Sequence, residues 1–245
     1  MVSLQQKMNA TLKDYGLIAD GDRVLIALSG GKDSLTLTDL LARRMKIFKP
    51  HFTLVAVHVV VDNVPYVSDR EYLHHFCEQR GVPFECVRTH FEEQTTESKN
   101  ICFLCSWYRR KALFETAKSL GCNKLALGHH RDDLLETLLM NMIFQGTIAT
   151  MPPMLPMEKF PLTIIRPLAR IAEDDIVAFA EEQGYKRMPK LCPHEHESQR
   201  TQVRHILEAM KRLAPDAVHS LWHSMENVKS TYLPQRVERC SHKTS

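Results

Sequence analysis

The fold of this chain is indicated most directly by the stretch Leu25-Ile26-Ala27-Leu28-Ser29-Gly30-Gly31-Lys32-Asp33-Ser34. The residues from Arg23 to Leu28 are almost continuously apolar, which is typical of a strand buried on both faces of a parallel sheet. Two glycines then permit a tight turn, and an apolar helical stripe begins at Leu35. Backbone amides at the start of that helix, two serine hydroxyls and a lysine charge are together suited to holding a phosphate.

The spacing of this loop excludes two familiar nucleotide-binding patterns. A Walker loop needs Gly-x-x-x-x-Gly-Lys-Ser/Thr, and Asp33 stands where its magnesium-binding hydroxyl would be. The dinucleotide pattern Gly-x-Gly-x-x-Gly is also absent. Ser-Gly-Gly-Lys-Asp-Ser after a strand instead resembles the PP-loop of the ATP pyrophosphatases, which split ATP between the α and β phosphates. The resemblance implies an ATP cradle formed by Ser29, Gly30, Gly31, Lys32, Asp33 and Ser34.

Length and composition fit an ordinary globular protein. The chain has 245 residues, 44% of them apolar, and a formal net charge of +3, which by itself does not indicate nucleic acid. There is no apolar run long enough for a transmembrane helix, so we expect no membrane partner. The polar N-terminal stretch does not resemble a secretory signal, and seven cysteines, an odd number, favour reduced thiols or metal ligands. We therefore expect a cytoplasmic protein.

Strands alternate with helices along the chain, which predicts an α/β fold: a Rossmann-like, doubly wound parallel sheet of about five strands with a helical C-terminal extension. The predicted strands are 23–28, 52–61, 82–87, 124–127 and 162–166. The predicted helices follow Leu35 and cover 69–80, 111–120, 132–144 and 173–183, with two more within 198–232. Residues 89–101 and 147–161 are expected to be loops. We assign 1–190 to an ATP-pyrophosphatase domain that includes the Cys-x-x-Cys segment, 191–233 to a helical segment with a third cysteine, and 234–245 to a disordered tail.

Three cysteines form a candidate metal site. Cys102 and Cys105 form a Cys-x-x-Cys step, and Cys192 is the candidate for a third ligand. Spacing alone leaves three readings open: zinc with His194 or His196 as the fourth ligand, a [4Fe-4S] cluster with one iron lacking a protein ligand, or a redox dithiol at Cys102 and Cys105. The other four cysteines, Cys77, Cys86, Cys122 and Cys240, are interpreted as structural or incidental.

A second polar motif, Gly128-His129-His130-Arg131-Asp132-Asp133, follows the fourth predicted strand. The carboxyl ends of parallel strands meet at one edge of a sheet, so we expect this motif to lie beside the Ser-Gly-Gly loop. We take Gly128 as part of the nucleotide site and Asp33 and Asp133 as candidate magnesium ligands. Lys32, Asp33 and Asp133 are the predicted catalytic residues.

Basic residues flank both halves of the cysteine site. Positive charge with interleaved aromatic residues can hold a phosphate backbone and stack an unpaired base. The candidates for RNA contact are Arg109, Arg110, Lys111, Arg200 and Arg204.

These motifs, taken in order with Met151-Pro152-Pro153, Ile165-Arg166-Pro167-Leu168 and Leu191-Cys192, resemble the TtcA family of tRNA 2-thiocytidine biosynthesis proteins. The resemblance covers roughly residues 5–233. It implies an enzyme that adenylates C2 of an anticodon-loop cytidine with ATP and magnesium, and then replaces the oxygen with sulfur. It also implies that Cys102, Cys105 and Cys192 bind a [4Fe-4S] cluster, with zinc as the alternative.

The implied partners are tRNA and a cysteine desulfurase as sulfur donor, and a homodimer is kept open. Two other functions compete with this one. The first is another PP-loop tRNA-modifying enzyme, which forms lysidine or thiolates a different base, and the second is a zinc-binding RNA-binding protein without chemistry. The thiol set argues against a ligase, because an amine nucleophile needs no soft metal. The phosphate loop argues against simple RNA binding.

Overall fold

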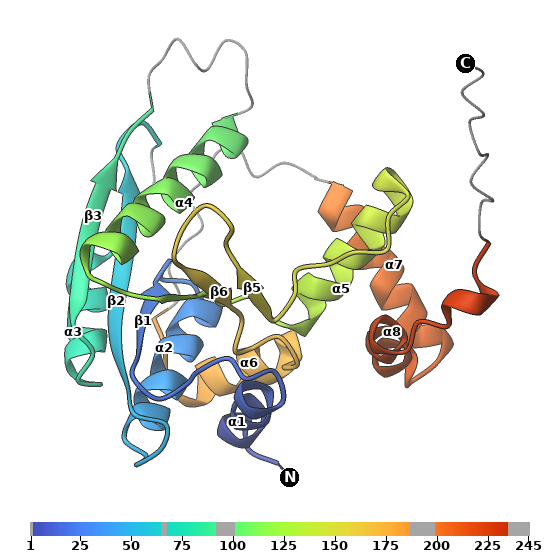
Figure 1. The fold of residues 1–245 in the computed structure, drawn as a ribbon, viewed down its shortest axis with the longest axis horizontal. Coiled ribbons are helices and arrows are strands. Elements are labelled where there is room, and N and C mark those ends of the chain that lie inside the picture. Colours follow the sequence, from blue (N-terminus) through green and yellow to red (C-terminus); the bar gives the residue numbers. More distant parts are fainter. Residues whose placement is uncertain (1, 65–67, 92–100, 187–198, 235–245) are drawn as a thin grey trace, which may run out of the picture.

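The protein is built on one six-stranded sheet. The computed structural model describes residues 2–64, 68–91, 101–186 and 199–234. The strand order is β3-β2-β1-β4-β6-β5 (Figure 1). The strands are β1 (Asp22–Ala27), β2 (Phe52–Val61), β3 (Phe84–Thr89), β4 (Lys124–Ala126), β5 (Met154–Pro156) and β6 (Thr163–Ile165). All neighbours pair in parallel except β5, which is antiparallel to β6. The predicted α/β sheet is confirmed, and the short strand β5 is an addition that the sequence analysis placed in a loop.

Strand β1 is covered on both faces, as its apolar sequence predicted. Val24 and Ile26 face one hydrophobic cluster, whereas Leu25 between them belongs to a second. The first cluster is formed with helices α1, α2, α3 and α6, and the second is formed mainly with α4, on the opposite face (Figure 1). Because both faces are buried, the carboxyl end of β1 is held rigidly where the Ser-Gly-Gly loop begins.

The helices around the sheet are α1 (Leu4–Asp14), α2 (Lys32–Met45), α3 (Arg70–Glu78), α4 (Ile101–Ser119), α5 (Arg131–Met140) and α6 (Glu173–Glu182). A π-helical turn η2 (Asn141–Gln145) extends α5. The sequence analysis assigned no helix at α1, although Ser3 and Gln6 form a capping box there and Met8 and Leu12 are buried.

Helix α4 begins earlier than predicted, at Ile101 instead of Lys111. Its first turns are apolar on one side. Leu104 packs against Val61, the last residue of β2, and against Phe91, which follows β3. The Cys-x-x-Cys step is therefore on a helix. Residues 92–100 of the predicted loop lie outside the described residues.

The C-terminal helices form a separate lobe beside α5, as Figure 1 shows. Helices α7 (Gln199–Leu213) and α8 (Ala217–Glu226) are followed by a 3-10 turn η3 (Ser230–Tyr232). They pack on α5 through Leu135, Leu139, Val203, Leu207 and Val218. The two helices predicted within 198–232 are confirmed, and Pro215 lies in the break between them. The proposed domain boundary at residue 190 and the tail after Pro234 lie outside the described residues.

A buried carboxylate joins the helices on the α2 face. Asp39 of α2, only 3% exposed, accepts hydrogen bonds from Arg43 and from the Tyr185 hydroxyl at 2.7 Å, and it ion-pairs with Arg80 at 3.2 Å. Burial alone would raise the pKa of Asp39, but the bonds from Tyr185 and Arg43 and the charge of Arg80 lower it. The folded state therefore favours the ionised carboxylate.

Replacing Asp39 with Asn should lower the free energy of unfolding by about 3 kcal/mol at pH 7, because it leaves buried donors without their charge partner. Urea unfolding measures this. Since the folded-state pKa is lowered, the contribution is present above the unfolded pKa of about 3.9 and is lost as the pH falls through the folded value. The difference between the two proteins should therefore shrink below about pH 4.

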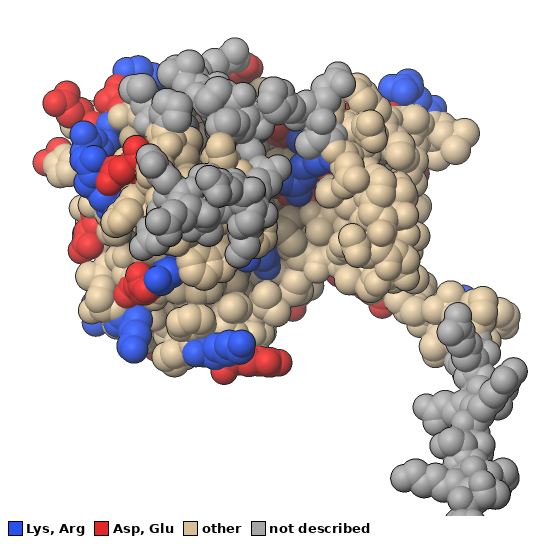
Figure 2. All heavy atoms as spheres, turned by 90° about the horizontal axis from the view of Figure 1, so that it is seen from above, with Lys and Arg blue, Asp and Glu red and all other residues tan. Residues whose placement is uncertain are grey.

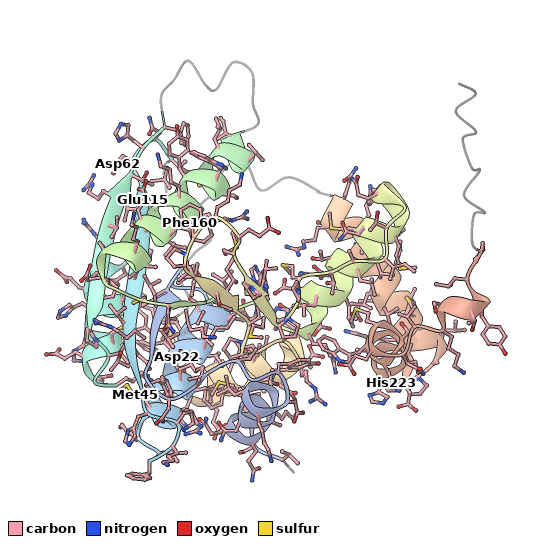
Figure 3. All side chains as sticks on the ribbon, in the orientation of Figure 1. Asp22, Met45, Asp62, Glu115, Phe160 and His223 are labelled. Carbon is pink, nitrogen blue, oxygen red and sulfur yellow. The ribbon has the colours of Figure 1, made fainter. Side chains whose placement is uncertain are left out.

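The matched control is Asp62→Asn. Asp62 pairs with Arg88 at 2.7 Å on the surface, where the side chains are 37% and 62% exposed (Figure 3). This change should cost less than about 1 kcal/mol. Equal losses in the two variants would contradict the structural role given to Asp39.

Candidate active site at the carboxyl edge of the sheet

The loop after β1 is held in shape by its own serines. Gly30 has a φ of +91°, a conformation that side chains with a Cβ rarely adopt. The Ser34 hydroxyl accepts from the Gly30 amide at 3.1 Å and donates to the Gly31 carbonyl at 2.9 Å. The Ser29 hydroxyl contacts that of Ser34 at 3.1 Å. Both hydroxyls thus fix the turn from which helix α2 begins, and the first amides of α2 have no intrahelical partners.

Lys32 is the first residue of α2 and carries the charge of this loop. Its ammonium donates to Glu173 Oε1 at 2.9 Å and lies 3.1 Å from Asp33 Oδ1. Burial lowers the pKa of Lys32, but the hydrogen bond to Glu173 and the charge of Asp33 outweigh it and raise the pKa. The lysine is therefore charged, as an anion cradle requires.

The second motif lies directly against this loop, as predicted. A Cβ added to Gly128 would come within 3.2 Å of the Asp33 carbonyl carbon and of the Ser34 nitrogen, which are backbone atoms. Such contacts are closer than side chains normally make. Only glycine at position 128 lets the loop after β4 approach the loop after β1 this closely.

Asp33 and Asp133 face each other across a buried histidine. His130, 3% exposed, places Nε2 3.5 Å from Asp133 Oδ2 and 4.0 Å from Asp33 Oδ1. The His130 backbone amide donates to Asp133 at 3.1 Å. Mg²⁺ is often held by one or two carboxylates together with substrate phosphates, so this pair fits a magnesium–ATP complex. Within the described part of the chain, no three His, Cys, Asp or Glu side chains are grouped to hold a metal alone.

Asp132 has a different role from its neighbour. It is buried, accepts the Glu173 backbone amide at 2.9 Å and lies 3.3 Å from the Lys211 ammonium of α7. Burial alone would raise its pKa, but the Glu173 amide, Arg131 and Lys211 lower it. Asp132 thus links the second loop, which is the segment 127–133 from the end of β4 into the first turn of α5, to α6 and α7.

His129 is neutral in this setting. Burial lowers its pKa to about 4 in spite of the nearby Asp133 carboxylate, and the charges of Arg166 and Arg200 act in the same direction as burial. Arg166 is itself buried, and burial together with Arg110 lowers its pKa to about 10. It donates to the Pro152 carbonyl at 2.6 Å, which anchors the segment before β5.

A small recess opens beside Ser29, where β1 ends next to Val57 of β2 and beneath α4. Its lining includes Leu28, Val57, His58, Arg109 and Leu113. The His58 ring is buried and its Nδ1 contacts the Leu28 carbonyl at 2.7 Å. The sequence analysis did not identify His58, because within an apolar strand it had no motif around it.

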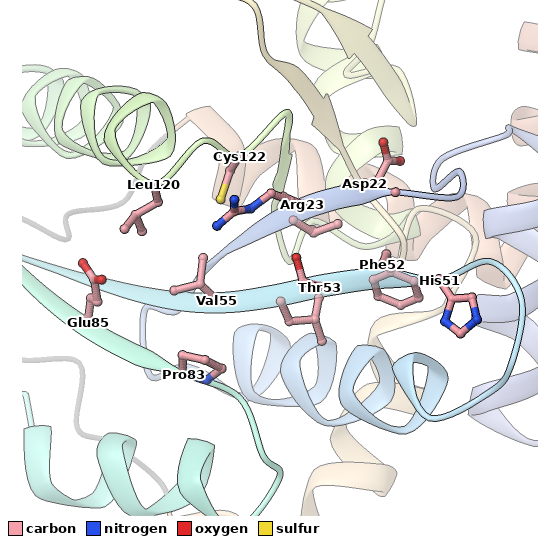
Figure 4. Close-up of a pocket in the computed structure, with 13 residues that line it drawn as sticks. Asp22, Arg23, His51, Phe52, Thr53, Val55, Pro83, Glu85, Leu120 and Cys122 are labelled. Atoms are coloured by element: carbon pink, nitrogen blue, oxygen red, sulfur yellow. The ribbon is translucent and has the colours of Figure 1, made fainter.

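Another hollow lies at the other edge of the sheet (Figure 4). Its volume is about 700 Å³, and it is lined by residues near the starts of β1, β2 and β3, among them Asp22, Arg23, Phe52 and Glu85. Because the strands are parallel, this edge is separated by their length from both loops. The hollow is not part of the site.

The cysteine motif begins helix α4 at the same edge as the loops. Cys105 is half-buried and packs on the cluster that includes Val61 and Phe91. The side chain of Cys102 and all of Cys192 lie outside what the structure describes. Cys77 and Cys122 are buried, and burial raises the pKa of both thiols, that of Cys77 to about 12. These two are structural, as expected.

The basic candidates lie on two helices. Arg109, Arg110 and Lys111 follow the cysteines on α4, and Arg109 lines the recess beside Ser29. Arg200 and Arg204 lie on α7 and clamp one buried carboxylate: their Nε atoms are 3.0 and 2.7 Å from the two oxygens of Glu136, whose side chain is 1% exposed. Figure 2, viewed from above Figure 1, shows Lys and Arg atoms in the recess between the main body and the C-terminal lobe.

Gly128→Ala should raise the KM for ATP on the order of tenfold, because the new Cβ pushes the two loops apart. Steady-state kinetics measure this. Gly184→Ala is the control: its φ of +65° strains an added Cβ, but nothing lies within 4 Å. It should lower the melting temperature without changing the KM. An unchanged KM in Gly128→Ala would contradict the close approach of the loops.

The comparisons with known proteins agree with this geometry. The sequence matches the PP-loop domain family over residues 1–211. The tRNA-cytidine(32) 2-sulfurtransferase of Vibrio cholerae serotype O1 (strain M66-2) is 36% identical over 235 residues, which are 94% of this chain and 75% of the relative. The protein of the same name from Cellvibrio japonicus (strain Ueda107) is 37% identical, with 94% and 77% covered.

A solved structure shares the fold. The U34-tRNA thiolase NcsA from Methanococcus maripaludis, with its [4Fe-4S] cluster, superposes with a TM-score of 0.72 at 26% sequence identity, covering 91% of this chain and 77% of that chain.

The two loops that meet at the carboxyl edge and the relatives that match nearly the whole chain lead to the same conclusion. The chain belongs to the tRNA-cytidine(32) 2-sulfurtransferase family of PP-loop proteins.

Proposed function

We propose that this protein thiolates cytidine 32 of tRNA in an ATP-dependent reaction that forms 2-thiocytidine. The observation that carries the proposal is the contact of the two loops at the carboxyl edge of the sheet, with α4 and its cysteine motif beginning at that same edge. Activation of a base oxygen and delivery of sulfur must occur at one carbon atom. A fold that brings a phosphate cradle and thiols to one edge meets that requirement.

ATP binds along this edge. The amides at the start of α2 and the Lys32 ammonium would hold the phosphates, and Asp33 and Asp133 would hold Mg²⁺, which would neutralise phosphate charge. The recess beside Ser29, apolar over most of its lining, receives the adenine ring. These assignments follow the predicted nucleotide residues Ser29, Gly30, Gly31, Lys32, Asp33, Ser34 and Gly128.

The reaction has two displacements. The C2 oxygen of the cytidine attacks the α-phosphorus of ATP, the bond to the bridging oxygen breaks and pyrophosphate leaves. Sulfur at the oxidation level of sulfide then attacks C2 as HS⁻, the C2–O bond breaks, AMP leaves with the former base oxygen, and the sulfur gives up its proton. Lys32 stabilises the negative charge that develops on the leaving pyrophosphate. The first step is needed because the amide-like carbonyl of cytosine is a poor electrophile.

Three thiolates are a donor set that fits a [4Fe-4S] cluster and leaves one iron without a protein ligand. We assign Cys102, Cys105 and Cys192 to this role, and the relative NcsA carries such a cluster. When bound, the cluster supplies an iron at which sulfur can be held. Zinc with His194 or His196 is the competing assignment, and both histidines lie outside the described residues.

The RNA lies over the basic side chains at this edge. Arg110 and Lys111 are exposed on α4. On α7, Arg200 is half-buried and Arg204 is exposed, and each contacts Glu136 through its Nε atom. We assign the sulfur supply to a cysteine desulfurase and place the reaction in the cytoplasm. For the assembly of the active form, a homodimer is to be tested against a monomer. Among the described helices, none has the length and apolar character to cross a bilayer.

Lys32→Ala should slow pyrophosphate release on the order of a hundredfold in an assay with ATP and tRNA, because the cradle loses its charge. Lys7→Ala is the control, since Lys7 pairs with Asp175 on α6 at 2.6 Å without taking part in either loop. If Lys32→Ala released pyrophosphate at the wild-type rate, the assignment of Lys32 to the nucleotide site would be wrong.

Cys105→Ser should abolish thiolation of tRNA by protein reconstituted anaerobically with iron and sulfide, and should reduce iron well below about four per chain. Thiolated nucleosides are measured by mass spectrometry and iron by a colorimetric assay. Cys86→Ser, which alters an exposed cysteine on β3, is the control and should leave both unchanged. A colourless wild-type protein with one zinc per chain would favour the zinc assignment.

A further inference from the structure

Glu173 is the residue of the nucleotide site that neither the motifs nor the proposed reaction assigns. It is the first residue of α6, and its Oε1 accepts from the Lys32 ammonium at 2.9 Å. The two side chains are 30% and 33% exposed, so solvent and a ligand can both reach them. Glu173 thus contacts the same cation that the phosphates of ATP need.

The placement of Glu173 depends on the second loop. Its backbone amide donates to the buried Asp132 carboxylate at 2.9 Å, and Asp132 is held from the other side by Lys211. The start of α6 is therefore fixed relative to both loops. Movement of the Glu173 side chain alone breaks its bond with Lys32, whose ammonium then keeps its contact with Asp33 Oδ1 at 3.1 Å.

The charges around Glu173 favour its ionised form. Burial alone would raise its pKa, but the hydrogen bond and charge of Lys32, followed by His130 and Arg204, lower it. An ionised carboxylate next to the cradle repels a polyphosphate and competes with it for the same ammonium. The Lys32 ammonium has three N–H donors, and while Glu173 and Asp33 hold it, part of its charge and at least one of its N–H groups are not available to a phosphate.

We infer that Glu173 is the internal counter-ion of Lys32: it yields the ammonium when the phosphates of ATP enter and takes it back when pyrophosphate leaves. Glu173 is a positioning residue, because it acts through Lys32 and not on the reacting atoms. It keeps the affinity for the pyrophosphate product low and holds the lysine in the cradle between turnovers. The inference rests on the nucleotide site proposed above.

The test is the binding of inorganic pyrophosphate to the full-length protein, measured by calorimetry with and without Mg²⁺. Glu173→Gln keeps the shape of the side chain and removes its charge. It should bind pyrophosphate on the order of threefold to tenfold more tightly under both conditions, as expected for a partly exposed charge pair. The KM for ATP should fall by a similar factor, while kcat stays equal or falls because product leaves more slowly.

Two further variants separate this role from a purely structural one. Asp175→Asn removes a neighbouring carboxylate on α6 whose partner is Lys7, so pyrophosphate binding should not change. Glu173→Asp keeps the charge but draws it back from Lys32, so its pyrophosphate affinity should lie between wild type and Glu173→Gln. Thermal unfolding of each variant shows whether it is folded.

Each other outcome has a definite meaning. Equal or weaker binding of pyrophosphate by Glu173→Gln without Mg²⁺ overturns the inference. Weaker binding only with Mg²⁺ also overturns it and makes Glu173 a metal ligand instead. If neither the wild-type protein nor Glu173→Gln binds pyrophosphate under either condition, the nucleotide site itself is wrong, and the proposed function fails together with the inference.

Discussion

The close approach of two loops is the constraint on which the site depends. The backbone at Asp33 and Ser34 comes so near to Gly128 that a Cβ at this position would lie 3.2 Å from it and would push the two loops apart. This contact is possible because β1 and β4 are adjacent and parallel, so that both loops leave the sheet at one edge. Where the two loops touch, Asp33 and Asp133 lie on either side of His130. Lys32, at the start of α2, then contacts Glu173 at the start of α6. The phosphate cradle is thus a product of the sheet order.

Charge compensation determines how the rest of the molecule joins this edge. Buried carboxylates of the second loop and α5 are each paired with cations from α7: Asp132 with Lys211, and Glu136 with Arg200 and Arg204. Burying a carboxylate is costly unless such partners are present. The C-terminal lobe therefore does more than cover apolar surface on α5, since it neutralises acidic groups one turn from the candidate magnesium ligands.

Local patterns allowed much of this to be predicted from the sequence. The apolar run before Ser29 and the alternation of strands and helices were sufficient for the parallel sheet, and parallel pairing then placed Gly128 beside the first loop. What depends on distant contacts was not predictable. Strand β5 exists because it pairs with β6, the early start of α4 depends on packing against Val61 and Phe91, and Glu173 enters the site only through tertiary placement. No local signal distinguishes Glu173 from an ordinary acidic residue at a helix N-terminus.

The most direct test of the whole account is the nucleoside composition of tRNA from a strain in which this gene is deleted, measured by mass spectrometry. The account predicts that 2-thiocytidine is absent from the deletion strain and returns when the wild-type gene is supplied on a plasmid. An unchanged level of 2-thiocytidine in the deletion strain, or the loss of a different modified nucleoside instead, would contradict it.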